Sequence, residues 1–216
     1  MKKQLLILFL CSVSLKVFLQ QDPEAKKILD QAAEKTKSYQ TIQVSYKLTV
    51  DDRKENTSSI SEGRIRIKGD KYRLDATESI VFFNGKTMWT YNEDVNEVII
   101  TEPDMEDEDF LSNPAKILAW YNRDFKYRYV SKARLDGNEV HEIDLFPNNL
   151  DQPYSRIKVY IAVKDTLLYL VRSIGKNGID YSIQLHDYIT NRELDDTLFT
   201  FDPARFRKVE IVDMRF

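Results

Sequence analysis

The 216-residue chain is 42% hydrophobic, 31% charged and 12% aromatic, a composition typical of one globular domain with a sizeable core and unlike that of a disordered or fibrous protein. Its net charge of -3 and isoelectric point of about 5.6 argue against a nucleic-acid partner, because such proteins usually carry a basic patch. The 12 tyrosines and 11 phenylalanines, set against only 6 glycines and 6 prolines, favour β-strands.

Residues 1–20 have the pattern of a secretory signal peptide, with lysines at the start followed by an apolar run from Leu5 to Leu15 that is too short to span a membrane comfortably. We therefore expect export to a bacterial periplasm and a single mature domain over residues 21–216. Removal of the segment would also remove Cys11, the only cysteine. The alternative is a lipid on Cys11, although Phe9 and Leu10 precede it where a lipoprotein signal has small residues.

The first element of the mature chain is predicted to be an amphipathic helix. Asp22, Pro23 and Glu24 are typical of a helix start, with the aspartate as N-cap and proline at the first helical position. Apolar residues then recur at helical spacing and form one stripe, which must pack on another apolar surface. The stripe consists of Ala25, Ile28, Leu29, Ala32, Ala33, Thr36 and Tyr39.

Strands follow the helix. Residues 42–50 alternate strictly between apolar and polar, and the polar residues Asp51 to Ser61 are predicted to form a connection. Two more strands are expected on either side of a Gly69-Asp70 turn. The inward side chains of these three strands are predicted to be Ile42, Val44, Tyr46, Leu48, Val50, Ile65, Ile67, Tyr72, Leu74 and Ala76.

The segment from Ile80 to Tyr91 is predicted to be a β-hairpin, because Asn84-Gly85 between apolar runs suits a type I′ turn. A strand over Glu97 to Thr101 follows. The acidic run from Glu102 to Asp109 then leads to a short helix over residues 115–122.

The second half returns to strands that are separated by turn signals, and residues 198–203 close this pattern before a short tail. Short strands without a βαβ rhythm predict a mainly β, α+β fold built on a large antiparallel sheet or open barrel. No repeat and no interdomain linker is evident.

The sequence offers little with which to catalyse a reaction. His141 and His186 lack accompanying ligands, and Gly85-Lys86-Thr87 lacks the upstream glycine of a phosphate-binding loop. The acidic run lacks the glycine of a calcium loop. No nucleophile motif occurs, so we expect no enzyme activity, no metal and no cofactor.

What remains is apolar surface, because only two helices are available to cover one face of a large sheet. These side chains could form an ordinary closed core, or they could line a hydrophobic groove beneath the helices. The periodicity of the sequence does not separate the two possibilities.

Several segments, taken in order, resemble the periplasmic outer-membrane lipoprotein carrier family, LolA. The sequence NGKTMWTY resembles the family's Asp-Gly-Lys-Thr-Leu-Trp-x-Tyr hairpin. The other matches are the helix that ends near Tyr39, the strand at Gly63, the sequence KYRLD, Asn113-Pro114 with Ile117-Leu118, and the sequence FTFDP from Phe199 to Pro203. The resemblance runs from about Asp22 to the end of the chain.

The resemblance implies an unclosed antiparallel β-barrel with an N-terminal and a second short helix as a lid over a hydrophobic cavity. A monomeric carrier of this kind takes acylated lipoproteins from an inner-membrane ABC transporter across the periplasm towards an outer-membrane acceptor. The lid helix would contribute Ile28, Leu29 and Ala32. The expected cavity or core lining is Val44, Tyr46, Leu48, Ile65, Ile67, Tyr72, Leu74, Val81, Phe83, Trp89, Ile117, Leu118 and Ile157.

Two departures from the family pattern concern the lid and the sheet. Lys68-Gly69 stands where the family commonly has Arg-Pro, so Lys68 is the candidate lid latch, with a point charge in place of a bidentate fork. Leu74 stands where the family has tryptophan. The alternative functions with the same fold are an outer-membrane lipoprotein receptor, which should be lipidated, and an envelope-stress sensor. A lipid-modifying enzyme would need a convergent nucleophile and base.

Overall fold

The computed structural model describes residues 22–102 and 117–215, with the backbone alone for 117–120. The predicted signal peptide with Cys11, the acidic run after Glu102 and Asn113-Pro114 lie outside the described residues. The helices are α1 (Pro23–Lys37) and α2 (Ile117–Asp124). The strands are β1 (Thr41–Asp52), β2 (Thr57–Lys68), β3 (Lys71–Asp75), β4 (Ser79–Phe83), β5 (Met88–Asn92), β6 (Glu97–Thr101), β7 (Phe125–Leu135), β8 (Asn138–Pro147), β9 (Tyr154–Ala162), β10 (Leu168–Gly175), β11 (Ile179–Thr190) and β12 (Glu210–Asp213).

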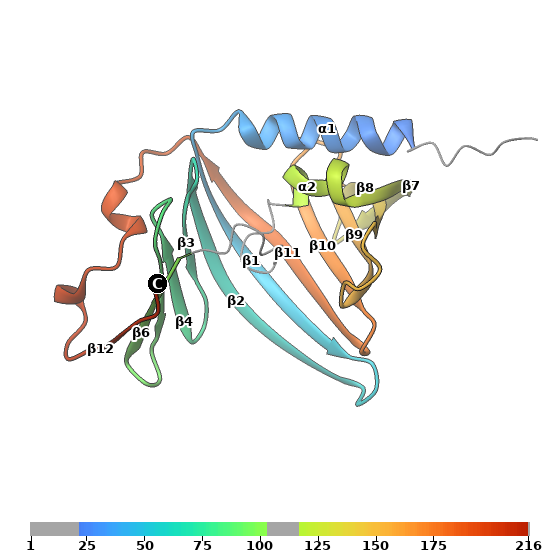
Figure 1. The fold of residues 1–216 in the computed structure, drawn as a ribbon. Coiled ribbons are helices and arrows are strands. Elements are labelled where there is room, and N and C mark those ends of the chain that lie inside the picture. The colour runs from blue at the N-terminus through green and yellow to red at the C-terminus, as the bar shows by residue number, and fades with distance from the viewer. Residues whose placement is uncertain (1–21, 103–116, 216) are drawn as a thin grey trace, which may run out of the picture.

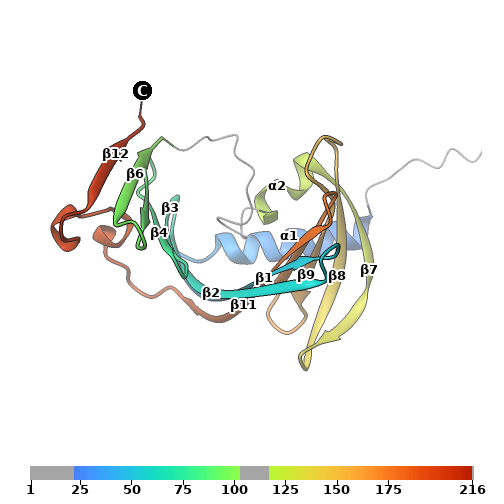
Figure 2. The same cartoon turned by 90° about the horizontal axis from the view of Figure 1, so that it is seen from below.

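Within the described residues, all the strands belong to one 12-stranded sheet with the order β12-β6-β5-β4-β3-β2-β1-β11-β10-β9-β8-β7. Neighbours are antiparallel except for β12, which lies parallel to β6. The sheet curves strongly without closing, and both helices lie on its concave side (Figure 1, Figure 2). The predicted mainly β, unclosed architecture is confirmed.

Helix α1 begins as predicted. Asp22 is its N-cap, and the Asp22 carboxylate accepts hydrogen bonds from the backbone N–H groups of Glu24 and Ala25 at 2.9 and 3.2 Å. The same carboxylate accepts a third bond, 2.9 Å long, from the backbone N–H of Tyr129 on β7. Asp22 therefore both starts the helix and fastens it to an edge of the sheet.

The first hairpin is longer than the sequence indicated. The predicted polar connection from Asp51 to Ser61 is mostly strand, because β1 continues to Asp52 and β2 begins at Thr57. The two strands pair without interruption from Thr41 opposite Lys68 to Asp52 opposite Thr57. Backbone pairing with β1 thus overrides the polar character of these residues.

The turn of the hairpin from Ile80 to Tyr91 differs from the prediction. The two strands pair as expected, but the last pair is Phe83 with Met88, which leaves a four-residue loop. Only Gly85 in this loop has a positive φ, of 94°, and the Asn84 side chain accepts bonds from the N–H groups of Lys86 and Thr87. The turn is therefore stabilised by a side-chain cap and is not of type I′.

The C-terminal segment also corrects the prediction. Residues 198–203 do not form a closing strand: they run from the end of the 3₁₀ turn η2 (Asp196–Phe199) to the start of the 3₁₀ turn η3 (Pro203–Arg205), without strand pairing between the two. The predicted tail instead contains β12, which covers the edge of β6. The short helix is α2, which runs to Asp124, beyond the predicted end at residue 122.

Two hydrophobic clusters lie on opposite faces of the sheet. The larger one, the inner core, joins α1 and Tyr121 to the concave side of β1, β2 and β7–β11. The smaller one, the outer cluster, comprises Phe82, Val98 and Phe201 with partly buried neighbours, and the C-terminal segment packs there. Among the described residues, no helix is long and apolar enough to cross a membrane.

Candidate functional site on the concave face

Two rows of apolar side chains start at β1 and cross the concave face, the first as far as β4 and the second as far as β5, and we call them the concave rows. Their positions follow from the cross-strand register, which pairs residues of the same face. The first row is Val44, Ile65, Leu74 and Val81. The second row is Ile42, Ile67, Tyr72, Phe83 and Met88.

Burial along the first row falls from the centre of the sheet outwards. Val44 and Ile65 are only 4% and 2% exposed, whereas Leu74 and Val81 are half-buried. In the second row Ile67 and Met88 are half-buried. Ile42, Tyr72 and Phe83 of the second row are buried, so only the first row runs evenly from the inner core to a partly accessible end.

Aromatic and sulfur contacts order the second row. The rings of Tyr72 and Phe83 lie 5.2 Å apart between centroids, and the Tyr72 hydroxyl lies 3.5 Å from the sulfur of Met88. Ile42 and Met88 complete this row although neither was among the expected lining residues. The alternation of residues 42–50 already indicated Ile42, while Met88 depends on the length of the loop before it.

Helix α1 packs on the concave face of the sheet through its apolar stripe. Its apolar stripe is buried: Leu29 and Ala32 are fully inaccessible, and Ile28 is 7% exposed. The main contacts of α1 are with α2, β7 and β9. The helix therefore seals the part of the concave face that is remote from the concave rows.

A charged link joins the two helices. The Tyr121 hydroxyl of α2 donates a hydrogen bond to the Asp30 carboxylate of α1, and Lys26 forms an ion pair with Asp30 at 2.6 Å. Burial tends to raise the pKa of Asp30, but these two donors outweigh burial and hold that pKa below its usual value. Burial and the neighbouring Asp30 carboxylate raise the pKa of Tyr121, so its hydroxyl stays protonated and remains a donor.

The remaining expected lining residues lie in different surroundings. Tyr46 is buried opposite Gly63, and Leu48 packs on the inner core. Ile157 is 1% exposed on β9, in the half of the sheet that the helices seal. Ile117 and Leu118 lie in the first turn of α2, where only the backbone is described.

Trp89 is a correction to the expected lining. It pairs with Phe82, whose side chain is on the opposite face from Val81 and Phe83. Trp89 accordingly packs in the outer cluster beside the C-terminal segment. The four-residue loop decides this, because a register shift of one residue would have turned Trp89 to the concave side.

Lys68 is a second correction. Its ammonium group donates a 2.8 Å hydrogen bond to the carbonyl oxygen of Leu194 and forms a 2.8 Å ion pair with Asp196. Lys71 also pairs with Asp196 at 2.8 Å, and these two lysines lower the pKa of Asp196 to about 2. In its described contacts Lys68 therefore fastens the C-terminal segment to the sheet and does not latch α1.

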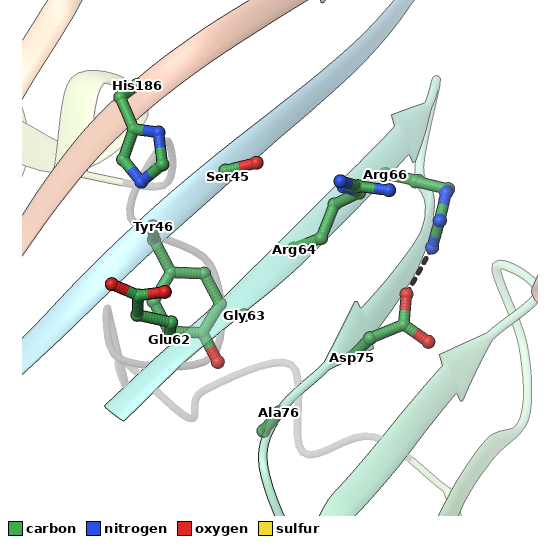
Figure 3. A pocket seen from close by; sticks show the side chains of 9 residues that line it. All are labelled: Ser45, Tyr46, Glu62, Gly63, Arg64, Arg66, Asp75, Ala76 and His186. Carbon is green, nitrogen blue, oxygen red and sulfur yellow. Dashed lines mark hydrogen bonds and ion pairs between the residues drawn. The ribbon is translucent and has the colours of Figure 1, made fainter. Parts of the chain in front are cut away.

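The convex side of β1–β3 carries a polar pocket of about 490 Å³, which nothing in the sequence indicated beyond alternating charges. Figure 3 shows Arg66 reaching Asp75, which also pairs with Arg73 at 2.7 Å. The described residues supply no partner for the guanidinium of Arg64. The pocket is lined by Ser45, Tyr46, Glu62, Gly63, Arg64, Arg66, Asp75, Ala76 and His186.

The two histidines have local partners. His141 lies 3.3 Å from the Tyr129 hydroxyl, and burial lowers its pKa, whereas His186 lies 2.9 Å from the carboxylate of Asp187. In the part of the chain that the structure describes, no three histidine, cysteine, aspartate or glutamate side chains are grouped to hold a metal ion. Among the described residues, the concave rows are therefore characterised by their apolar side chains.

Comparison with known proteins finds relatives in sequence and in fold. An outer-membrane lipoprotein carrier protein from Coxiella burnetii (strain RSA 331 / Henzerling II) is 24% identical over 208 residues, covering 93% of this chain and 92% of the relative. An uncharacterised conserved protein from Thermus thermophilus has a similar fold, with a TM-score of 0.56 at 12% identity over 88% of this chain and 99% of the other.

A LolA superfamily protein from Nitrosomonas europaea aligns with a TM-score of 0.44 at 14% identity, over 82% of this chain and 97% of the other. The model of the family described as outer membrane lipoprotein carrier protein LolA matches residues 37–202, which include β1–β11. The chain belongs to the LolA family of outer membrane lipoprotein carrier proteins.

Proposed function

We propose that this chain is a periplasmic carrier that binds the acyl chains of lipoproteins on its concave face and shuttles them from the inner to the outer membrane. It would act as a binding protein without catalysis and as a monomer. Its partners would be acylated lipoproteins, an inner-membrane lipoprotein-releasing ABC transporter and an outer-membrane acceptor. A signal peptide over residues 1–20 would deliver the protein to the periplasm.

The observation that carries this proposal is the gradient of burial along the first concave row, from Val44 and Ile65 to Leu74 and Val81. A closed core would bury its outer members as deeply as its inner ones, since interiors are close-packed. Leu74 and Val81 instead stay half-buried, although Val44 and Ile65 in the same row are buried. This arrangement suits a guest that is apolar, flexible and elongated.

The energetics favour an acyl chain as this guest. Each methylene that leaves water contributes about 0.8 kcal/mol, so a chain with about 15 methylenes gains roughly 12 kcal/mol when it is fully buried. Part of this gain is offset because the chain loses conformational freedom and any groups that cover the rows must move.

The experiment is a release assay with spheroplasts that retain a radiolabelled triacylated lipoprotein. Purified mature protein is added, and the lipoprotein in the soluble fraction is measured. We expect release by the wild-type protein and loss of release for a double variant with Leu74→Ser and Val81→Ser. The matched control is Val95→Ser, which alters a residue that is 64% exposed between β5 and β6.

Release that is absent with the folded wild-type protein would overturn the carrier proposal. Equal release by the double variant and the control would be compatible with a carrier, but it would show that the lipoprotein does not bind at Leu74 and Val81. Circular dichroism and thermal unfolding of all three proteins ensure that folded molecules are compared.

A further inference from the structure

Strand β2 has a free edge over half of its length. It pairs with β1 from Thr57 to Lys68, whereas β3 pairs only with Arg64 to Lys68. Within the described residues, no strand pairs with residues 57–63 on the side away from β1. Residues 57–60 are all exposed, so this edge is accessible to another chain.

The backbone groups that face outwards can be identified from the register. The two-residue turn at Gly69-Asp70 makes Lys68 and Lys71 a hydrogen-bonded pair, so the even-numbered residues of β2 direct their N–H and C=O groups towards the β3 side. By the same alternation Ser58, Ile60 and Glu62 direct theirs to the free edge. The Thr77 hydroxyl lies 3.5 Å from the carbonyl oxygen of Glu62, consistent with this direction.

This edge lacks the features that protect the outer edge of the sheet at β7 from pairing with another strand. Strand β7 presents exposed cations at Lys126, Arg128, Lys132 and Arg134 and carries a bulge near Tyr129, which are common protections against strand pairing. The free half of β2 has the sequence TSSISEG, with no lysine, arginine or proline and no break in its register. Its composition permits an added strand.

A cationic group stands at one end of the free edge. The pocket of Figure 3 is lined there by Gly63, Ala76 and Arg64. Asp75 is shared by Arg66 and Arg73, so Arg64 is the guanidinium left to bind an anion. Glu62 lines the same pocket, and its negative charge reduces the positive potential there. An anion would therefore bind through direct hydrogen bonds from Arg64.

The free edge is also continuous with the concave rows. Gly63 lies opposite Tyr46, and Ile65 is the next residue of β2 on the concave side. Leu74, the half-buried partner of Ile65 on β3, lies beside this end of the free edge, so an acyl chain in contact with Leu74 would leave the polypeptide attached to it near residues 57–63.

We propose that an extended polypeptide segment pairs with residues 57–63 of β2 as an added strand and places an acidic side chain against Arg64. The inference rests on the proposed function, since the segment is the protein portion of an acylated cargo next to its acyl chains. Pairing of this kind uses backbone hydrogen bonds, so it tolerates many cargo sequences, and the single charge contact adds orientation.

The test measures affinity by fluorescence anisotropy for three synthetic probes. One is a diacylated lipopeptide with a tail of about eight threonine and valine residues and one aspartate, a length that spans the free half of β2. The second has the same tail with alternate amides N-methylated, and the third has the acyl groups without a tail. We expect the first probe to bind about tenfold more tightly than the other two, as a few net hydrogen bonds allow.

Two variants at one position separate backbone pairing from side-chain contact. Ile60→Pro removes an N–H group at the free edge without touching the bonds to β1, and it should reduce the first probe to the affinity of the tail-less probe. Ile60→Thr keeps the N–H group and should leave the tenfold advantage intact. Arg64→Gln should lower the affinity for the first probe and leave the affinity for the tail-less probe unchanged.

The outcomes distinguish this inference from the proposed function. If all three probes bind the wild-type protein with equal affinity, the proposal of an added strand is wrong, while the proposal of acyl binding is supported. Failure of every probe to bind overturns the proposed function itself. The N-methylated probe tests the same hydrogen bonds on wild-type protein, so the result does not depend on the folding of the proline variant.

Discussion

The concave face of the sheet is one apolar surface with two different halves. On β7–β11, side chains such as Ile143, Val159 and Val171 are fully inaccessible, because α1 packs against β7 and β9. On β2–β5 the concave rows have similar residue types, yet Leu74 and Val81 remain half-buried. Cover by a helix thus accompanies complete burial on β7–β11, whereas burial on β2–β5 is uneven, and it is the uneven half that we propose as the binding surface.

This difference also explains why the fold tolerates an incomplete core. The sealed half contains long strands and most of the fully buried side chains, so it supplies most of the burial free energy. The outer cluster adds stability on the other face of β4–β6, where Phe201 and Phe206 stack with centroids 4.6 Å apart. Strands β4–β6 are therefore held in place by packing on their convex side.

The largest expected effect comes from Leu29→Ala, which breaks the seal between α1 and the sheet. The side chain is fully buried, so we expect the free energy of unfolding to fall by about 3 kcal/mol. Urea unfolding measures this loss. Leu74→Ala, in the half-buried part of the concave rows, should cost about 1 kcal/mol, and equal losses for the two variants would remove the distinction between the halves.

Polar substitution in the concave rows should act on binding more than on stability. We expect Leu74→Ser with Val81→Ser to reduce the affinity for a fluorescent fatty acid by about tenfold, because apolar contact area is lost. Titration of the probe measures this change. Val171→Ala on the sealed half serves as the comparison, since it should lower stability and leave the affinity of the folded protein unchanged.

The link between the helices can be weakened by Tyr121→Phe. This removes the hydroxyl that donates to Asp30, and we expect a loss of about 1 kcal/mol in the free energy of unfolding. Hydrogen exchange of α1 amides would show whether the loss is local to the seal. If the substitution accelerates exchange more in β4 and β5 than in α1, the Tyr121–Asp30 bond does not act locally on the packing of α1.

The same link predicts a pH dependence. The pKa of Asp30 is depressed in the folded protein, so its contribution to stability is present above the ordinary carboxyl pKa and is lost as pH falls through the lowered folded value. The stability advantage of wild type over Asp30→Asn should therefore be seen at neutral pH and vanish in strong acid. Chemical unfolding at a series of pH values measures it.

The smallest expected effect concerns the C-terminal segment. Lys68→Ala removes a donor to Asp196, so the pKa of that carboxyl should rise from about 2 towards its ordinary value. Carbon-detected NMR titration of Asp196 measures the change. If the substitution also changes the affinity for an acyl probe, Lys68 acts as a lid latch. If the affinity is unchanged, Lys68 only holds the C-terminal segment to the sheet.

Much of the local structure could be predicted from the sequence, because it depends on neighbouring residues. The start of α1 at Asp22-Pro23 and the alternation along β1 are local properties, and both are confirmed. The inward positions Ile65, Ile67 and Leu74 follow from the same period of two, and the structure brings them together in the concave rows.

Tertiary structure alone decided the face of Trp89, the partners of Lys68 and the extent of β2. Trp89 turned outwards because a loop of four residues set the register, and Lys68 met Asp196 from a distant part of the chain. The polar residues after Asp51 became strand because β1 and β2 could pair across them. The period of a sequence specifies which side chains share a face, but the register between strands and the packing of distant segments specify what that face meets.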